Sequence, residues 1–360
     1  MFIQRKQYLA DIKRIRVSEG RDLDHGLRLD RNEKVDVWPK QVMTDIFTSK
    51  PDYFLSVYPE STALYQKLAR FHKVDEAELL LTAGIDGGLK TLFEVMTAPG
   101  DLVGVVTPTY AMYQVYAKLF QVNLCEIGYS DKFEFNFEQF DEFLAKKPTM
   151  FFLPNPNQPI ESSFTLAQLE KFAQKTLAAN CLFVIDEAYH LFGAATAVGL
   201  VKKYENAVIA RTFSKGFGVP SIRLGYLISN ADNMNILTKT RFAHESNALS
   251  NAVAEYLLDH YDMVEAYNRR VMEAREELKA ILGKKGIPAV GKTGNFLLLD
   301  LGSEARAKTF VTSLREQKIY MKGPWSSPWN RYVTITLGPM DIMQRFVDAT
   351  TAFCGAERSA

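Results

Sequence analysis

Five short runs of apolar residues recur through the middle of the sequence, separated by longer segments with helical spacing. Each run is almost continuously apolar, whereas a strand with one face in water would alternate apolar and polar residues. Continuous runs are typical of strands buried on both faces of a mainly parallel sheet, with helices covering each side. The runs span residues 102–106, 150–153, 181–185, 207–210 and 224–228, and helical patterns between them span roughly 111–120, 166–179 and 193–204.

After about residue 247 the pattern changes. A long helical segment, 252–282, ends at two glycines and is followed by alternating strand-like and helix-like segments. These later segments span 295–300, 305–317, 332–337 and 341–353. The sequence therefore predicts a larger α/β unit followed by a smaller α+β unit, and the first forty-odd residues form an arm that could pack on either.

Charge and cysteine usage exclude several classes of protein. The 43 basic and 42 acidic residues leave a net charge of +1, which argues against a strongly basic nucleic-acid binder. The three cysteines are odd in number and lack CxxC spacing, so neither a disulfide framework nor a zinc clip is expected. The histidines show no metal-binding spacing, and no apolar run approaches the length of a membrane span. We expect a cytoplasmic protein without a metal or membrane partner.

Charged residues directly follow two of the core strands. Asp186 directly follows the run 181–185, and Lys215 lies a few residues after the run 207–210. In an open parallel sheet the carboxyl ends of the strands form the edge where ligands bind, so these two side chains could meet there. Taken singly, Asp186 is better explained as a helix cap and Lys215 as part of a solvated turn.

Three further features make a cofactor site the better interpretation. Arg223 stands beside a glycine-bearing turn, and Gly84 leads into a helical pattern whose N-terminus could bind an anion. Tyr110 and Tyr189 each follow a core strand. Together these residues supply an amine, a carboxylate, a flat ring, a phenol and a phosphate pocket. That set is what pyridoxal phosphate (PLP) requires.

These motifs, in this order, resemble the fold type I PLP enzymes, specifically the class I/II aminotransferases and most closely the histidinol-phosphate aminotransferase group. The resemblance runs from Leu29–Glu33 to Thr334–Gly338. It implies a PLP-transferase fold, in which a mainly parallel seven-stranded sheet lies between helices beside a smaller α+β domain. The implied division is an N-terminal arm over 1–46 joining the small domain, a large PLP-binding domain over 47–246 and a small domain over 247–360.

The resemblance also implies a role for each residue at the cofactor ring. Lys215 would bind PLP covalently and later move the proton between the substrate α-carbon and the cofactor C4′. Asp186 would pair with the ring nitrogen and keep it protonated. Tyr189 would hydrogen-bond the phenolic oxygen O3′, and Tyr110 would stack on the ring.

A second implied group holds the cofactor phosphate. The helix that begins near Gly84 would offer backbone amides, two hydroxyls would follow the run 207–210, and an arginine would pair with the dianion. A tyrosine would reach the same phosphate from the neighbouring subunit of a homodimer, so that the two subunits share each active site. The residues at these positions are Gly84, Ile85, Asp86, Thr212, Ser214, Arg223 and, from the neighbouring subunit, Tyr58.

The sequence departs from the family pattern in two places. Gln158 stands where the family has an asparagine that contacts O3′, while Asn157 lies one residue earlier, so either amide could make that contact. Thr334 replaces an arginine that binds the substrate's acidic group, and threonine cannot form a charged bidentate pair. Arg331, three residues earlier, is the candidate replacement.

The resemblance implies a biosynthetic PLP-dependent transaminase. Such an enzyme moves an amino group from a donor to a keto or aldehyde acceptor, a small phosphorylated metabolite being one candidate. A PLP-dependent decarboxylase resembling threonine-phosphate decarboxylase is the alternative, because it uses nearly the same cofactor residues. A PLP-sensing regulator is disfavoured, because such proteins carry a fused DNA-binding domain and this chain has no net basic charge.

Overall fold

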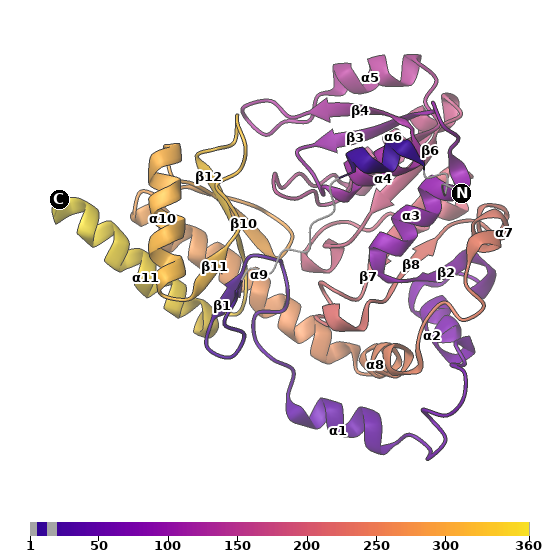
Figure 1. Ribbon diagram of the computed structural model, residues 1–360, viewed down its shortest axis with the longest axis horizontal. Coiled ribbons are helices and arrows are strands. Elements are labelled where there is room, and N and C mark those ends of the chain that lie inside the picture. The colour runs from indigo at the N-terminus through magenta and orange to yellow at the C-terminus, as the bar shows by residue number, and fades with distance from the viewer. Residues whose placement is uncertain (1–5, 13–19, 360) are drawn as a thin grey trace, which may run out of the picture.

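The computed structural model describes residues 6–12 and 20–359, and its centre is a seven-stranded sheet (Figure 1). The strand order is β2-β8-β7-β6-β5-β3-β4; the two described pairs that involve β8 are antiparallel, and the other four are parallel. The prediction of a mainly parallel sheet is therefore confirmed. The strands are β2 (Leu79–Thr82), β3 (Leu102–Thr107), β4 (Asn123–Gly128), β5 (Met150–Pro154), β6 (Leu182–Asp186), β7 (Ala207–Thr212) and β8 (Gly225–Ile228).

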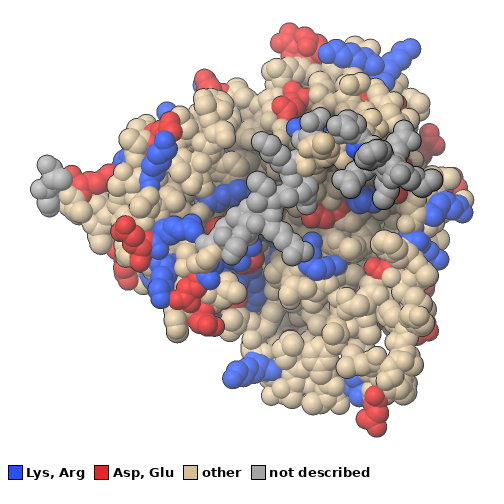
Figure 2. Space-filling model, in the orientation of Figure 1, with Lys and Arg blue, Asp and Glu red and all other residues tan. Residues whose placement is uncertain are grey.

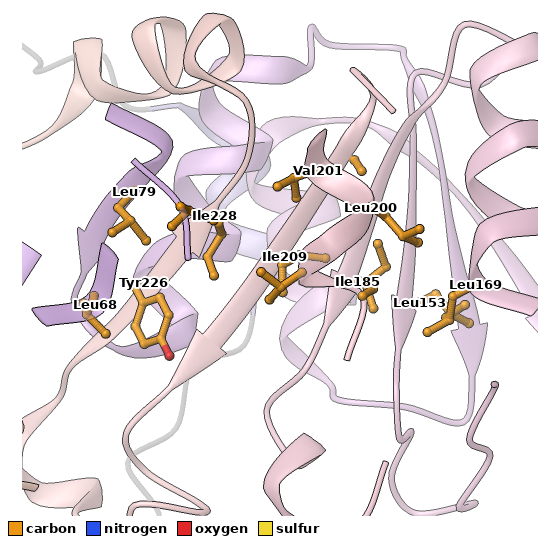
Figure 3. Packing of buried hydrophobic residues seen from close by; sticks show 14 of the residues in the cluster. Leu68, Leu79, Leu153, Leu169, Ile185, Leu200, Val201, Ile209, Tyr226 and Ile228 are labelled. Atoms are coloured by element: carbon orange, nitrogen blue, oxygen red, sulfur yellow. The ribbon is translucent and has the colours of Figure 1, made fainter. Parts of the chain in front are cut away.

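Successive residues of the central strands point into two separate apolar cores. On β5, Phe151 and Leu153 belong to one core, whereas Met150 and Phe152 belong to the other. Figure 3 shows part of the first core, in which the paired residues Ile185, Ile209 and Ile228 come from three adjacent strands. Both faces are covered by helices, which explains why the strands are continuously apolar in sequence.

The helices divide between the two faces of the sheet. The first core receives side chains from α1 (Lys40–Thr48), α2 (Thr62–His72), α5 (Phe137–Ala145), α6 (Leu166–Ala178) and α8 (Ala248–Asp259). The second receives them from α3 (Gly84–Met96), α4 (Met112–Phe120) and α7 (Ala231–Leu237). Local hydrogen bonds determine where helices begin, as at α6. The backbone N–H of Gln168 donates to the Thr165 hydroxyl oxygen, and the backbone N–H of Thr165 donates to the Gln168 side-chain oxygen.

A smaller unit lies beside the large sheet (Figure 1). It contains an antiparallel sheet of β9 (Ala289–Val290), β10 (Phe296–Asp300) and β12 (Tyr332–Thr336), and a parallel pair of β1 (Leu27–Leu29) and β11 (Ile319–Met321). The long helix α9 (Tyr261–Lys284) extends from α8 towards this unit (Figure 1). The smaller unit also contains the helices α10 (Glu304–Glu316) and α11 (Met340–Ser359). The strands and helices expected after residue 290 are all present.

Two expected helices differ from the structure. The segment 193–204 contains only a five-residue 3-10 helix, Val198–Lys202, because the chain there wraps around the buried side chain of Glu187. The Glu187 carboxylate accepts hydrogen bonds from the Thr196 hydroxyl and the Ala197 amide. The long helix expected over 252–282 is broken at His260, whose φ of −116° and ψ of 44° are not helical, so α8 and α9 are separate helices.

The N-terminal segment touches both units. Its strand β1 pairs with β11 of the smaller unit, whereas Val42 and Ile46 of α1 belong to the first core of the large sheet. That core also includes residues from α8 and Val264 at the start of α9, which lie beyond residue 247. The division into an arm over 1–46, a large domain over 47–246 and a small domain over 247–360 stays a prediction.

The described surface shows no dominant sign of charge in the view of Figure 2. Basic and acidic side chains are interspersed on that face, in keeping with the net charge of +1. Over residues 6–12 and 20–359, no helix combines the length and the apolar character needed to cross a membrane.

The close packing of β3 on α5 predicts a stability difference between two glycine variants. A Cβ at Gly104 would lie 2.5–2.9 Å from ring atoms of the fully buried Phe143, whereas a Cβ at Gly199 would meet nothing within 4 Å. We expect Gly104→Ala to lower the free energy of unfolding by roughly 1–3 kcal/mol, the usual cost of overpacking, and Gly199→Ala to leave it almost unchanged. Urea unfolding of both variants tests this, and equal midpoints would contradict it.

Candidate active site

A cavity lies at the edge where the parallel strands end. Pro154 closes β5, Asp186 closes β6 and Thr212 closes β7, and all three residues line this cavity. The strands are parallel neighbours, so their carboxyl ends necessarily face the same space. The cavity therefore lies at the edge where the sequence predicts a ligand to bind.

Most of the residues expected to bind the cofactor line this one cavity. Gly84 adjoins it at the N-terminus of α3, directly before Ile85. Tyr58 does not line the cavity; its ring is 76% exposed and stacks on His244, with the ring centres 4.5 Å apart. The expected residues that line the cavity are Ile85, Asp86, Tyr110, Asn157, Gln158, Asp186, Tyr189, Thr212, Ser214, Lys215 and Arg223.

Lys215 presents its amine to the cavity in a partly buried position. Its Nζ donates a hydrogen bond to the backbone carbonyl of Arg31 at 2.7 Å. Burial is the largest cause that lowers the pKa of Lys215, to about 8; the positive charges of Lys322 and Arg223 act in the same direction, and Glu33 acts against them. A lysine with a lowered pKa is partly neutral near pH 7, as an amine that attacks a carbonyl must be.

Asp186 is a buried carboxylate whose two described hydrogen-bond donors are uncharged. The Tyr113 hydroxyl donates to Oδ2 at 2.7 Å, and the Ala188 amide donates to Oδ1 at 2.9 Å. Burial raises the pKa of Asp186 to about 6, against the effect of these two bonds. A protonated ring nitrogen in the cavity would supply the positive charge that favours the ionised form. Asp186 therefore fits the PLP ring.

The start of α3 fits a phosphate. Gly84 has φ +68°, and a Cβ there would lie 2.9 Å from the Arg223 guanidinium, so glycine lets the arginine approach the helix N-terminus. On the other side, a Cβ on Gly225 would lie 2.6 Å from the Gly84 backbone. Helix N-termini with a nearby arginine bind phosphate through free amides and a guanidinium. Thr212 and Ser214 line the same cavity with hydroxyl groups.

The aromatic residues of the site are tied to neighbouring polar groups. The Tyr110 hydroxyl donates to Asp86 at 2.9 Å, and the Tyr189 hydroxyl accepts from the Asn32 side chain at 2.9 Å. Burial is the main cause that raises the pKa of both tyrosines, so their hydroxyls stay protonated. Both side chains can therefore serve as neutral rings and hydrogen-bond donors.

Several residues of the site were missed by the sequence analysis. Arg31 and Glu33 line the cavity, although the segment Leu29–Glu33 was noted only as the start of the resemblance and within the arm, with no site role. Tyr113 was also missed, and a signal for it exists, because it follows Tyr110 by three residues at the start of a helix. Asn32 carried no such signal, since its contact with Tyr189 spans 157 positions.

The structure does not bring Arg331 into this cavity. The Arg331 guanidinium lies 2.9 Å from Asp300 and donates to the Tyr332 hydroxyl at 2.7 Å. Thr334 is buried, and its hydroxyl oxygen accepts a hydrogen bond from the Trp325 indole at 2.9 Å. An indole therefore occupies the side of Thr334 on which a longer side chain would extend.

Comparison with known proteins identifies the family. Residues 25–349 match the family described as aminotransferase class I and II. The chain belongs to this family.

It is 29% identical over 287 residues to histidinol-phosphate aminotransferase 1 of Carboxydothermus hydrogenoformans, covering 79% of this chain and 81% of the relative. It is 30% identical over 275 residues to the histidinol-phosphate aminotransferase of Pyrococcus furiosus, covering 76% and 78%. The protein is thus a PLP-dependent transaminase, with an amino donor and a keto acceptor as its substrates.

Solved structures show the same fold for this aminotransferase. Histidinol-phosphate aminotransferase from Sinorhizobium meliloti, in complex with pyridoxal-5′-phosphate, superposes with a TM-score of 0.87 at 22% identity and covers 99% of both chains. L-threonine-O-3-phosphate decarboxylase from Porphyromonas gingivalis superposes with a TM-score of 0.73 at 21% identity, covering 90% of this chain and 98% of that one. The fold is therefore shared by transaminases and a decarboxylase.

The position of Lys215 in the aminotransferase cavity leads to a direct test. We expect Lys215→Ala to lose both the visible absorbance of covalently bound PLP and the transaminase activity, because Lys215 is the only lysine among the described residues that line the cavity. Lys203→Ala, at an exposed lysine paired with Glu170, should keep both. Borohydride reduction followed by mass spectrometry makes the measurement. PLP retained covalently by folded Lys215→Ala would contradict the assignment.

Proposed function

We propose that this aminotransferase acts on a small amine that carries an acidic group, with histidinol phosphate as the first candidate. The observation that supports this is that curated relatives covering about four fifths of the chain are histidinol-phosphate aminotransferases. The cavity supplies a complementary set of groups for the cofactor, as the pairing of Arg223 with the start of α3 illustrates.

The residues expected to bind the cofactor have proposed tasks in the transamination. PLP supplies an electron-withdrawing ring that stabilises negative charge at the substrate α-carbon. Lys215 moves the proton at that carbon, and Asp186 holds the ring nitrogen in its protonated form. Tyr189 donates to the phenolic oxygen, and Tyr110 stacks on the ring. The phosphate is bound by Gly84, Ile85, Asp86, Thr212, Ser214 and Arg223.

Gln158, and not Asn157, is proposed as the amide that reaches the cofactor's phenolic oxygen. The Asn157 Nδ2 donates to the backbone carbonyls of Pro108 and Ile160, both at 3.0 Å, and its Oδ1 accepts from the Thr109 hydroxyl at 2.7 Å. Both of its amide hydrogens are therefore used by the backbone. Gln158 lines the cavity and is only partly buried.

A homodimer with shared active sites is part of the proposal. Tyr58 is exposed in the single chain, although tyrosine buries a large apolar ring when it finds a partner. We propose that this ring contacts the cofactor phosphate of a second copy. A cytoplasmic location is proposed because the three cysteines are all free.

Lys322 is the proposed partner of the substrate's acidic group. Its backbone pairs with Thr334 through two hydrogen bonds of 3.0 and 2.8 Å, and residues paired in this way project their side chains from the same face. The Lys322 ammonium lies 4.7 Å from the centre of the Trp325 ring, which also bonds Thr334. Its charge contributes to the lowered pKa of Lys215. We propose that this lysine takes the role that Arg331 was expected to fill.

A half-reaction tests the proposed transamination. We expect an amine donor to replace the visible band of bound PLP with the ultraviolet band of the pyridoxamine form, without release of carbon dioxide. The donor screen pairs histidinol phosphate with histidinol, which lacks only the phosphate, and pairs amino acids with their decarboxylated amines. Stopped-flow absorbance and carbon dioxide capture provide the two readouts. Carbon dioxide release without the spectral conversion would favour the decarboxylase alternative.

The proposed role of Lys322 is tested by comparison with Arg331. We expect Lys322→Met to raise KM for the acidic donor found in the screen about tenfold, on the order of one lost charge-assisted hydrogen bond, with a smaller effect on the matched neutral donor. Arg331→Met should leave both KM values unchanged. The reverse result for the two variants would return the role to Arg331.

A further inference from the structure

Asn32 connects the cofactor cavity with the smaller unit, although it does not itself line the cavity. It is 5% exposed, and its side-chain Nδ2 donates to the Tyr189 hydroxyl at 2.9 Å. Its backbone amide donates to the Thr336 hydroxyl at 2.9 Å, and its backbone carbonyl accepts from Asn295 at 3.2 Å. Thr336 ends β12, and Asn295 directly precedes β10.

The hydrogen-bond network around Thr336 determines which way the Asn32 amide points. The Thr336 hydroxyl oxygen already accepts from the Asn32 backbone amide, so its own proton is available for Asn32 Oδ1, 3.2 Å away. With Oδ1 acting as acceptor there, Nδ2 faces Tyr189. An amide nitrogen can only donate, so the Tyr189 oxygen must accept in this contact. The proton of the Tyr189 hydroxyl is thereby left for a group in the cavity.

The backbone at this point is held in a special conformation. Asn32 has φ +53°, in the left-handed region that asparagine and aspartate tolerate better than most residues. The carbonyl of the preceding residue, Arg31, accepts from Lys215. Two adjacent residues of the arm thus contact the reactive lysine and the tyrosine expected at the phenolic oxygen.

We propose that Asn32 is a positioning residue that directs the Tyr189 proton into the cavity and couples this direction to the position of the smaller unit. The proposal rests on the role given above to Tyr189. It follows that a movement of β12 relative to the sheet would carry Asn32 with it and change how strongly Tyr189 donates. Through the arm, the position of the smaller unit would in this way affect the hydrogen bond that the cofactor receives from Tyr189.

Substitution by aspartate tests the direction of the hydrogen bond. Asn32→Asp keeps the shape of the side chain and tolerates the left-handed backbone, but its carboxylate would accept the Tyr189 proton and withdraw it from the cavity. The readout is the pH titration of the visible band in the PLP-loaded enzyme without substrate. Loss of a donor makes the cofactor's phenolic oxygen more basic, so the pKa of the band should rise.

The experiment is a double-mutant cycle with Tyr189→Phe. We expect each single variant to raise the pKa of the band by about one pH unit, the order of one lost hydrogen bond, and the double variant to match Tyr189→Phe alone. Thr336→Val, which removes the group that orients the amide, should give a smaller rise. Asn268→Asp, at a buried asparagine of α9 outside the cavity lining, should titrate like the wild type.

The outcomes separate this inference from the proposals on which it rests. If Tyr189→Phe shifts the band but Asn32→Asp and Thr336→Val do not, the positioning role of Asn32 is wrong while that of Tyr189 stands. Additive shifts in the double variant would also overturn it, because Asn32 would then act by another route. If Tyr189→Phe causes no shift, both roles fail. A failure of histidinol phosphate as substrate leaves this test untouched, since no substrate is present.

Discussion

Parallel strands that end at one edge of a sheet impose the arrangement on which the rest of this aminotransferase depends. The backbone continues beyond β3, β5, β6 and β7 at the same side, so residues far apart in sequence enter one cavity. The antiparallel strand β8 begins at this edge, which brings Arg223, just before it, to the start of α3. The seven-stranded order therefore positions both Lys215 and the expected phosphate site.

A buried ion pair joins the carboxyl ends of β6 and β7, the two strands that lead to Asp186 and Lys215. The Arg211 guanidinium lies 2.6 Å from the Glu187 carboxylate, and both side chains are almost wholly buried. Glu187 follows Asp186 directly, and Arg211 lies four residues before Lys215. Removing one partner of such a pair leaves an uncompensated buried charge, which is strongly destabilising. The pair therefore links the residue after β6 to β7 close to Asp186 and Lys215, whose pKa values are shifted by burial.

The N-terminal segment is more than a covering arm. Between its strand β1 and helix α1 it passes the cavity, where Arg31 and Glu33 form part of the wall and Asn32 bonds Tyr189. The same segment is fastened to the smaller unit by β1 and by Thr336. A single stretch of chain therefore contacts both units and the cavity, which is the physical basis of the coupling proposed above.

Sequence alone was sufficient for the fold class, for five of the seven strands of the large sheet and for a set of expected cofactor residues, most of which line one cavity. Burial on both faces leaves a continuous apolar run, and PLP needs specific functional groups at strand ends, so both signals are local.

Tertiary structure decided the features that depend on distant partners. The segment 193–204 wraps around buried Glu187 and so does not form the expected helix, and Arg331 pairs with Asp300 outside the cavity. The side-chain amide of Asn157 donates both of its hydrogens to backbone carbonyls. Asn32 contacts Tyr189 only because the folded arm crosses the edge of the sheet. These contacts join residues that no local pattern relates, because a hydrogen bond depends on position in space and not on separation along the chain.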